Sequence, residues 1–260
     1  LAPYFYLYFK SMMDDPVALT QYMRDCQRIF DICDAGGKDV LDVGCGFGLL
    51  AIHLAYMGAG RVFATDLNQE KIAVLNKILS RLESPPNNLE VKLADALRLD
   101  FADGRFDVVM VNNVISHVRD RDAFLLQVNR VLRPGGILYI HDGNNKLNLL
   151  PTLRIRRNRR MLEYGPIDET QLRGTDKAIP WVILRERMIA QRYPALESAR
   201  LKHLARETAG MAGEEIYRAV AEYLKEGKIR QKPDFKFRNP ETGEYQEYPF
   251  HPYGLASQLK

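Results

Sequence analysis

Short apolar runs alternate with longer stretches of helical periodicity between residues 38 and 142. This alternation is typical of repeated strand–helix–strand units that share one parallel sheet. The runs are apolar at nearly every position, as in strands that are covered on both faces. They predict five strands, over residues 40–42, 61–66, 89–95, 106–112 and 136–142. We therefore expect an α/β fold with a doubly wound, mostly parallel Rossmann-like sheet.

The segments on either side of this core show no comparable strand pattern. Residues 1–36 predict one or two helices, and apolar side chains recur at helical spacing over residues 181–193, 195–208 and 214–226. We expect four parts: an N-terminal helical segment over 1–36, the core over 37–146, a helical insertion over 147–235 and a return segment to the sheet over 236–260. The return segment contains a predicted hairpin around residues 240–243. It ends in an unfinished helical pattern, so the native chain is expected to continue beyond Lys260.

Composition narrows the class of protein without choosing a function. Of the 260 residues, 46% are hydrophobic and 27% are charged, which is typical of a globular protein with a substantial core. The net charge of +4 is too small to require a nucleic acid or a membrane as partner. Three cysteines without a C-x-x-C pair or a histidine cluster favour neither disulfides nor a metal site. We expect a cytoplasmic protein without a metal ion, whose apolar opening is too short to span a membrane.

The sequence VLDVGCGFG, residues 40–48, places three glycines directly after the first predicted strand. Such a turn lets the backbone approach a ligand closely and directs the N–H groups of the next helix toward it. Dinucleotide-binding proteins use the spacing G-x-G-x-x-G, whereas Gly44, Gly46 and Gly48 follow G-x-G-x-G. The turn therefore predicts a ligand site and argues against an NAD-dependent oxidoreductase.

Three aspartates accompany the glycine turn. Asp66 ends the second predicted strand, where a carboxylate can accept hydrogen bonds from ribose hydroxyls. Asp95 ends the third strand beside the apolar Leu97, a combination that suits the amine and the face of an adenine. Asp42 precedes the turn and can hold an ammonium group. Together they predict a nucleoside that carries an amine and a positive centre.

These motifs resemble those of the class I S-adenosylmethionine-dependent methyltransferases, particularly the group that modifies small molecules. The resemblance covers residues 38–142 and extends through VFATD, LADA, FDVVMVNNVISHV and VNRVLRPGGILYIHD. It implies S-adenosyl-L-methionine as cofactor, with the glycines bordering its methionine part, Asp66 at the ribose and Asp95 at the adenine. Asn112 would lie beside the sulfonium. The residues implied to bind the cofactor are Asp42, Gly44, Cys45, Gly46, Gly48, Asp66, Leu67, Asp95, Ala96 and Asn112.

The resemblance implies methyl transfer to a small-molecule acceptor, in which alignment of the reactants supplies most of the catalysis. The enzymes that methylate amines of bases or glutamine commonly carry an N-P-P-Y-type segment, which is replaced here by NNVI at residues 112–115. This replacement argues against methylation of the amines of adenine or cytosine and does not affect oxygen, carbon or aliphatic nitrogen as acceptor atoms. O-methylation is favoured, and nitrogen and carbon remain open. His141, at the end of the fifth strand, is the candidate general base, and His117 is a second candidate. A purely structural role is the alternative for both histidines.

The basic run RIRRNRR, residues 154–160, carries five arginines. It predicts either a docking site for an anionic acceptor or RNA, or a solvated helix face paired with Glu163, Asp168 and Glu169. Nucleic acid is the less favoured partner, because aromatic side chains are not interleaved with the arginines. The alternatives to a small-molecule enzyme are an RNA or protein methyltransferase that uses this run and a non-catalytic cofactor-binding scaffold.

The same resemblance implies that the helical insertion at 147–235 forms the cap that binds the acceptor. The aromatic opening YFYLYF, residues 4–9, predicts a lid over the cofactor, the buried face of a first helix or a contact in a homodimer.

Overall fold

The structure, a computed structural model, describes residues 14–143, 147, 149–165, 179–247, 250 and 255. These residues fall into two compact units, one within Leu1–Gly143 with Tyr253–Lys260 and the other within Asn144–Pro252. Each unit has its own hydrophobic core. The aromatic opening at residues 4–9 lies outside the described residues, and its role stays a prediction.

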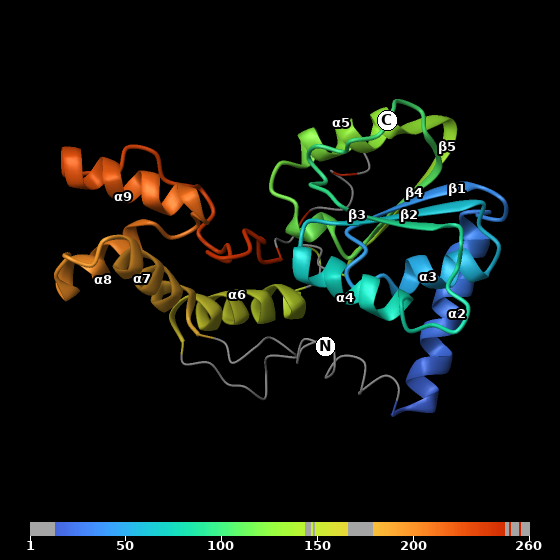
Figure 1. Cartoon of the computed structure of the whole chain (residues 1–260), viewed down its shortest axis with the longest axis horizontal. Coiled ribbons are helices and arrows are strands. Elements are labelled where there is room, and N and C mark those ends of the chain that lie inside the picture. The colour runs from blue at the N-terminus through green and yellow to red at the C-terminus, as the bar shows by residue number, and fades with distance from the viewer. Residues whose placement is uncertain are drawn as a thin grey trace. The chain divides into compact units, whose positions relative to one another are not determined.

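Five parallel strands form the sheet of the first unit, in the order β3-β2-β1-β4-β5 (Figure 1). The strands are β1 (Asp39–Val43), β2 (Arg61–Asp66), β3 (Leu89–Leu93), β4 (Phe106–Asn112) and β5 (Leu132–His141). β1 pairs with β2 on one side and with β4 on the other, so the winding direction reverses between β1 and β4. Doubly wound sheets bind ligands beyond the carboxyl ends of the strands at this reversal.

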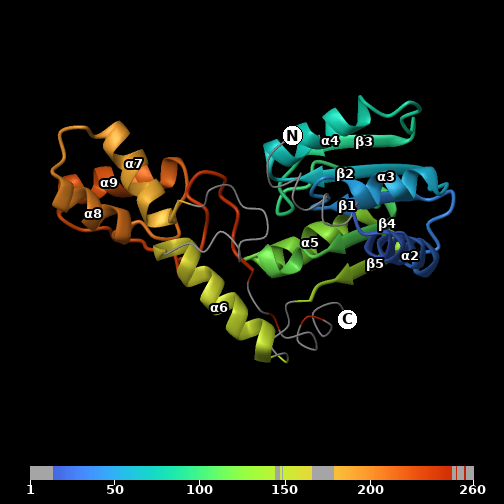
Figure 2. The same ribbon diagram turned by 90° about the horizontal axis from the view of Figure 1, so that it is seen from below.

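Helices cover both faces of the sheet, which confirms the predicted doubly wound fold. α2, α3 and α4 lie on one side and α5 on the other (Figures 1 and 2). Side chains of a strand alternate between faces, and Val40, Val62 and Met110 pack in one cluster with residues of α2 and α3. The helices are α2 (Pro16–Ile32), α3 (Leu49–Tyr56), α4 (Gln69–Leu79) and α5 (Arg121–Val131), with the 3-10 helix η1 (Ile115–His117) before α5.

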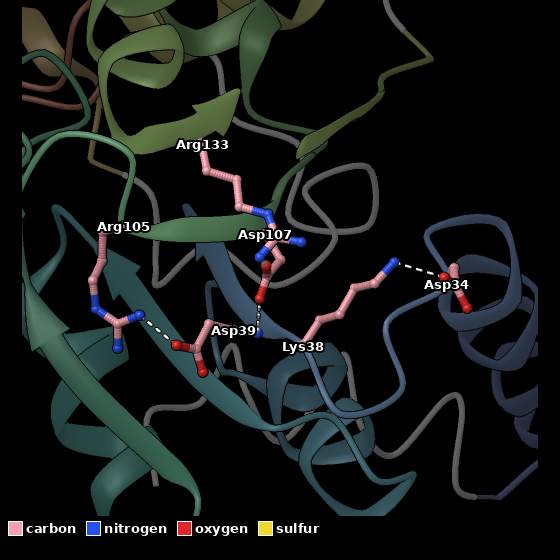
Figure 3. Close-up of polar contacts among 6 residues, drawn as sticks. All are labelled: Asp34, Lys38, Asp39, Arg105, Asp107 and Arg133. Carbon is pink, nitrogen blue, oxygen red and sulfur yellow. Dashed lines mark hydrogen bonds and ion pairs between the residues drawn. The ribbon is translucent and has the colours of Figure 1, made fainter. Parts of the chain in front are cut away.

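Charged side chains hold the strands together at the amino-terminal edge of the sheet (Figure 3). The carboxylate of Asp107 accepts the backbone N–H of Asp39 at 2.7 Å and pairs with Arg133. The carboxylate of Asp39 pairs with Arg105. These contacts join β1, β4 and β5 at the end opposite the glycine turn, so they contribute to the frame and not to a ligand site.

Four helices make up the described part of the second unit: α6 (Leu149–Tyr164), α7 (Trp181–Arg192), α8 (Ser198–Glu207) and α9 (Glu214–Glu226). Arg185 of α7 is fully buried, pairs with Glu163 of α6 and donates from Nε to the carbonyl oxygen of Ala205 in α8 at 2.7 Å. Burial raises the pKa of the Glu163 carboxyl, and the charge of Arg185 opposes this rise. The buried side chain of Arg185 therefore joins three helices, through an ion pair to α6 and a hydrogen bond to α8.

The arginine run lies on α6, as the interpretation of a helix face requires, although the bounds of this helix were not predicted. Arg159 is buried, with its guanidinium 4.8 Å from the ring centroid of Phe235 and 5.6 Å from that of Phe237. It also donates a hydrogen bond to the carbonyl oxygen of Glu247. One arginine of the run therefore belongs to the core of the unit.

Arg156, Arg157 and Arg160 are not paired with Glu163 as predicted. That part of the prediction is wrong, because Glu163 faces the interior and is bound to Arg185. Asp168 and Glu169 lie outside the described residues. Three side chains of the run are exposed, and no ion pair is found for them within the described part of the chain: Arg156, Arg157 and Arg160.

Most strand positions agree with the sequence prediction. β2 and β4 have the predicted bounds, while β5 begins at Leu132 and not at residue 136. β3 ends at Leu93, so Asp95 lies in the turn after the strand and not at its end. The predicted hairpin is confirmed by an antiparallel bridge between Arg238 and Tyr245.

Candidate functional site

The glycine turn connects β1 to α3 through three residues with left-handed backbone. Gly44, Gly46 and Gly48 have φ values of 71°, 59° and 74°. A Cβ atom on Gly44 would lie 2.4 Å from the side chain of Val114, and one on Gly48 would lie 2.4 Å from that of Leu75. At Gly46 a Cβ would meet no atom within 4 Å. The first and third glycines are therefore required by packing, and the middle one presents bare backbone to open space.

Asp66 connects the turn after β1 to the turn after β2. Its Oδ2 accepts the N–H of Gly46 at 2.8 Å, and its Oδ1 accepts the N–H of Asn68 at 2.8 Å. Asp66 is only 7% exposed. A carboxylate has about four acceptor positions, so each oxygen keeps one for a ligand hydroxyl. The geometry thus holds a preoriented acceptor pair beside the glycine turn.

Asp42 is a buried carboxyl group beneath the same turn. It is 2% exposed, and its Oδ2 has no hydrogen-bond partner among the described residues. Burial, with a further contribution from the charge of Asp66, raises the pKa of Asp42 from 3.8 to about 7. A buried carboxylate with an unused acceptor is stabilised by a cation, which fits a site for an ammonium group.

Cys45 follows the first glycine, and its N–H donates to the carbonyl oxygen of Thr65 at 2.8 Å. Burial and the neighbouring carboxylates raise the pKa of its thiol. A thiol held in its neutral form is a poor nucleophile, so a reactive role for Cys45 is not indicated.

The turn after β3 lies next to that after β2. The N–H of Ala94 donates to the carbonyl oxygen of Asp66 at 3.0 Å, and the carboxylate of Asp95 accepts the N–H of Leu97 at 2.9 Å. Leu67 and Leu97 are 49% and 38% exposed. The edge therefore combines an accessible carboxylate with apolar side chains, as an adenine site needs.

The carboxyl ends of β4 and β5 carry Asn112 and His141. Their side chains are hydrogen-bonded, with 3.0 Å between His141 Nδ1 and Asn112 Oδ1. The carboxylate of Asp142 accepts the backbone N–H of Ser116 at 2.9 Å and so ties η1 to the end of β5. His117, the second candidate base, is exposed, and its N–H donates to the carbonyl oxygen of Val114 at 2.8 Å.

Every residue predicted for the cofactor lies in β1, β2 or β4 near its carboxyl end or in the turn that follows β1, β2 or β3. The sequence analysis missed Asn68, whose side chain accepts the N–H groups of Glu70 and Lys71 and begins α4. An asparagine just before a helical period is the signal that would have identified it. No sequence pattern predicted that the side chain of Val114 packs against Gly44.

Within the described residues, no group of three or more His, Cys, Asp or Glu side chains could hold a metal ion.

Comparison with known proteins agrees with this geometry. Residues 41–140 match a family described as a methyltransferase domain. Methyltransferase GfsG of Streptomyces halstedii is 34% identical over 46% of this chain and 43% of its own. A ubiquinone biosynthesis O-methyltransferase of Mesorhizobium japonicum is 34% identical over 44% of each chain. A 2-methyl-6-phytyl-1,4-hydroquinone methyltransferase of Synechocystis is 36% identical over 51% of this chain and 43% of its own.

Residues 41–140 therefore match a methyltransferase-domain family, and the similar proteins are named methyltransferases, in agreement with the class I S-adenosylmethionine-dependent methyltransferases that the motifs predicted. A solved S-adenosylmethionine-dependent methyltransferase of Methanosarcina mazei is 29% identical over 46% of this chain and 59% of its own, with a TM-score of 0.41. The chain spans about half the length of the curated relatives that it matches or less. No helix in the described part of the chain is long and apolar enough to cross a membrane.

Proposed function

We propose that the protein transfers a methyl group from S-adenosyl-L-methionine to an oxygen atom of a small molecule. The observation that carries this proposal is the joint geometry of the glycine turn, the buried Asp42 and the preoriented Asp66. Asp66 would bind the ribose, Asp95 and the Ala96 backbone the adenine, and Asp42 the ammonium group. When bound, the cofactor supplies a methyl group on a positively charged sulfur that leaves as a neutral thioether.

The protein's own contribution is alignment and removal of one proton. Alignment of two reactants is worth about 7–11 kcal/mol, whereas a general base adds about 10²–10⁴-fold. His141 is exposed at the carboxyl end of β5, where it would accept the proton of the acceptor hydroxyl. With the cofactor bound, the acceptor oxygen would gain the methyl group as the carbon–sulfur bond breaks, and the imidazole of His141 would hold the proton.

Oxygen as the acceptor atom is supported by the names of several relatives. The Mesorhizobium relative is an O-methyltransferase, as is cnsE of Penicillium expansum, which is 32% identical over 42% of this chain. A norajmaline N-methyltransferase of Rauvolfia serpentina is also similar, at 30% identity over 44% of this chain. Nitrogen is therefore the acceptor atom that an assay should test next.

An anionic acceptor is a finer proposal, supported by the exposed arginines of α6. Arg156, Arg157 and Arg160 are spaced three and four residues apart, which places Arg160 beside both of the others on the helix surface. Guanidinium groups bind carboxylates and phosphates in a bidentate manner. A phosphorylated or carboxylated acceptor would use these contacts.

Calorimetry with S-adenosylhomocysteine tests the cofactor site. We expect Asp66→Ala to weaken binding at least tenfold, about 1.4 kcal/mol or more, and Asp66→Asn to weaken it less, because one acceptor oxygen remains. Asp100→Ala is the matched control, since Asp100 is exposed and pairs with Lys92. Equal affinity of the wild type and Asp66→Ala would contradict the ribose assignment.

A second assay separates an enzyme from a scaffold. The protein is incubated with methyl-labelled cofactor and a panel of phenols, amines and a metabolite extract. Labelled product on a hydroxyl supports the proposal. Tight cofactor binding without any labelled product from the extract favours the non-catalytic scaffold.

A further inference from the structure

The paired ends of β4 and β5 contain one side-chain contact whose chemistry the cofactor site does not explain. Asn112 and His141 are register partners, each the last residue of its strand. Side chains of directly paired residues in neighbouring strands lie on the same side of the sheet. Their 3.0 Å contact joins the candidate general base to a residue that the family resemblance places at the sulfonium.

The backbone holds this pair in place. The N–H of Asn113 donates to the carbonyl oxygen of His141 at 2.7 Å, and Asn113 has a left-handed φ of 56°. Asparagine adopts left-handed backbone more readily than most residues, so Asn113 can form this turn while its N–H stays bonded to His141. Asn112 is half-buried, which limits competition from water for its amide. The contact is therefore a built feature of the strand ends.

The atoms in contact determine which nitrogen of the imidazole carries the proton. The amide Oδ1 is an acceptor only, so it can bond Nδ1 only when Nδ1 carries hydrogen. A neutral imidazole with hydrogen on Nδ1 has its lone pair on Nε2. His141 is exposed, so that lone pair remains accessible to an acceptor hydroxyl.

We infer that Asn112 is a positioning residue that sets the tautomer and orientation of His141, leaving Nε2 free as the proton acceptor. The inference rests on the proposed function for its catalytic meaning, whereas the tautomer itself is a property of the free protein. It assigns Asn112 to the base and not primarily to the cofactor. Asp142, whose carboxylate accepts the Ser116 N–H, and His117 of η1 are two further titratable residues in the segments that follow β5 and β4.

Nitrogen NMR on protein labelled at histidine tests the tautomer without cofactor or acceptor. His141→Gln identifies the signals of His141 among the five histidines. We expect hydrogen on Nδ1 in the wild type, a shift toward hydrogen on Nε2 in Asn112→Leu, and hydrogen retained on Nδ1 in Asn112→Asp. Asn76→Leu, at an exposed position on α4, is the matched control and should leave the spectrum of His141 unchanged.

Two results of this experiment would overturn the inference. One is hydrogen on Nε2 in the wild type, which means that the amide donates to Nδ1. The other is an unchanged tautomer of His141 in an Asn112→Leu variant whose cooperative thermal unfolding shows that it is folded. Both results are read without turnover, so they are independent of whether methyl transfer itself is confirmed.

Kinetics with an acceptor identified by the labelling assay then separate positioning from cofactor binding. We expect Asn112→Leu to lower kcat about tenfold or more while the affinity for S-adenosylhomocysteine changes less than twofold. Asn112→Asp should restore most of kcat and move the acidic limb of the pH–rate profile to higher pH, because a carboxylate favours the imidazolium. A loss of cofactor affinity that accounts for the whole loss of activity would contradict the positioning role and assign Asn112 to cofactor binding.

Discussion

Replacing Asp42 with asparagine tests how the protein prepares the site for a cation. The two side chains have nearly the same shape, so the substitution removes charge and little volume. In the folded protein the pKa of Asp42 lies at about 7 against an ordinary value of 3.8. The folded state therefore binds the proton more tightly than the unfolded state does. The contribution to stability is complete below about pH 4 and is lost as the pH rises to 7.

The size of the effect follows from this difference. Each pH unit corresponds to about 1.4 kcal/mol, so ionised Asp42 destabilises the folded protein by roughly 4 kcal/mol above pH 7. The asparagine amide would itself be buried without all of its partners, at a cost of about 1–3 kcal/mol. At pH 8 we therefore expect Asp42→Asn to be more stable than the wild type by about 1–3 kcal/mol. Near pH 4 the order should reverse.

Urea denaturation at pH 4.5, 6 and 8 measures this difference, and equal m-values would show that the same surface unfolds. Calorimetry with S-adenosylhomocysteine at pH 8 should show weaker binding by the variant, because the ammonium group loses its carboxylate. In the wild type, binding of S-adenosylhomocysteine at pH 6.5 should release a fraction of a proton from Asp42. The binding enthalpy in buffers of different ionisation enthalpy measures this proton release. A stability difference that does not change with pH would refute the assignment of a raised pKa to Asp42.

Three further substitutions test the frame and the acceptor region. Gly48→Ala should lower the free energy of unfolding by about 1–3 kcal/mol, because its Cβ would meet Leu75 at a φ of 74°; Gly143→Ala, with open space at its Cβ, is the control in a thermal melt. Arg185→Leu should destabilise the second unit by about 3–5 kcal/mol at pH 8 and by less at pH 5, because Glu163 can take up a proton there. An equal loss of unfolding free energy at both pH values, measured by urea denaturation, would contradict the buried ion pair. Joint replacement of Arg156, Arg157 and Arg160 by glutamine should raise KM for an anionic acceptor and leave KM for the cofactor unchanged. An unaltered KM for that acceptor, measured at low salt, would contradict an anion site on α6.

Local sequence patterns were sufficient to predict the central strands and the turn that needs left-handed backbone. β2 and β4 have the predicted bounds, and each contains a short run of consecutive apolar residues, 62–64 in β2 and 108–111 in β4. The glycine turn was predicted from spacing, and all three of its glycines have positive φ. The bounds of α6 were not predicted, because arginines occupy both its buried and its exposed positions and obscure the helical spacing of its apolar side chains. A buried Arg159 over two phenylalanine rings has no signature in a hydropathy pattern.

The amino-acid sequence by itself determined the α/β core, the turn and the order of the acidic residues, because each depends on neighbours within a few positions. The tertiary structure alone decided which of these groups meet. Asp66 accepts the N–H of Gly46, 20 residues away, and Asn112 contacts His141, 29 residues away. Both contacts exist because parallel pairing brings the carboxyl ends of separate strands to one edge. The burial that raises the pKa of Asp42 likewise depends on the packing of the whole unit around β1.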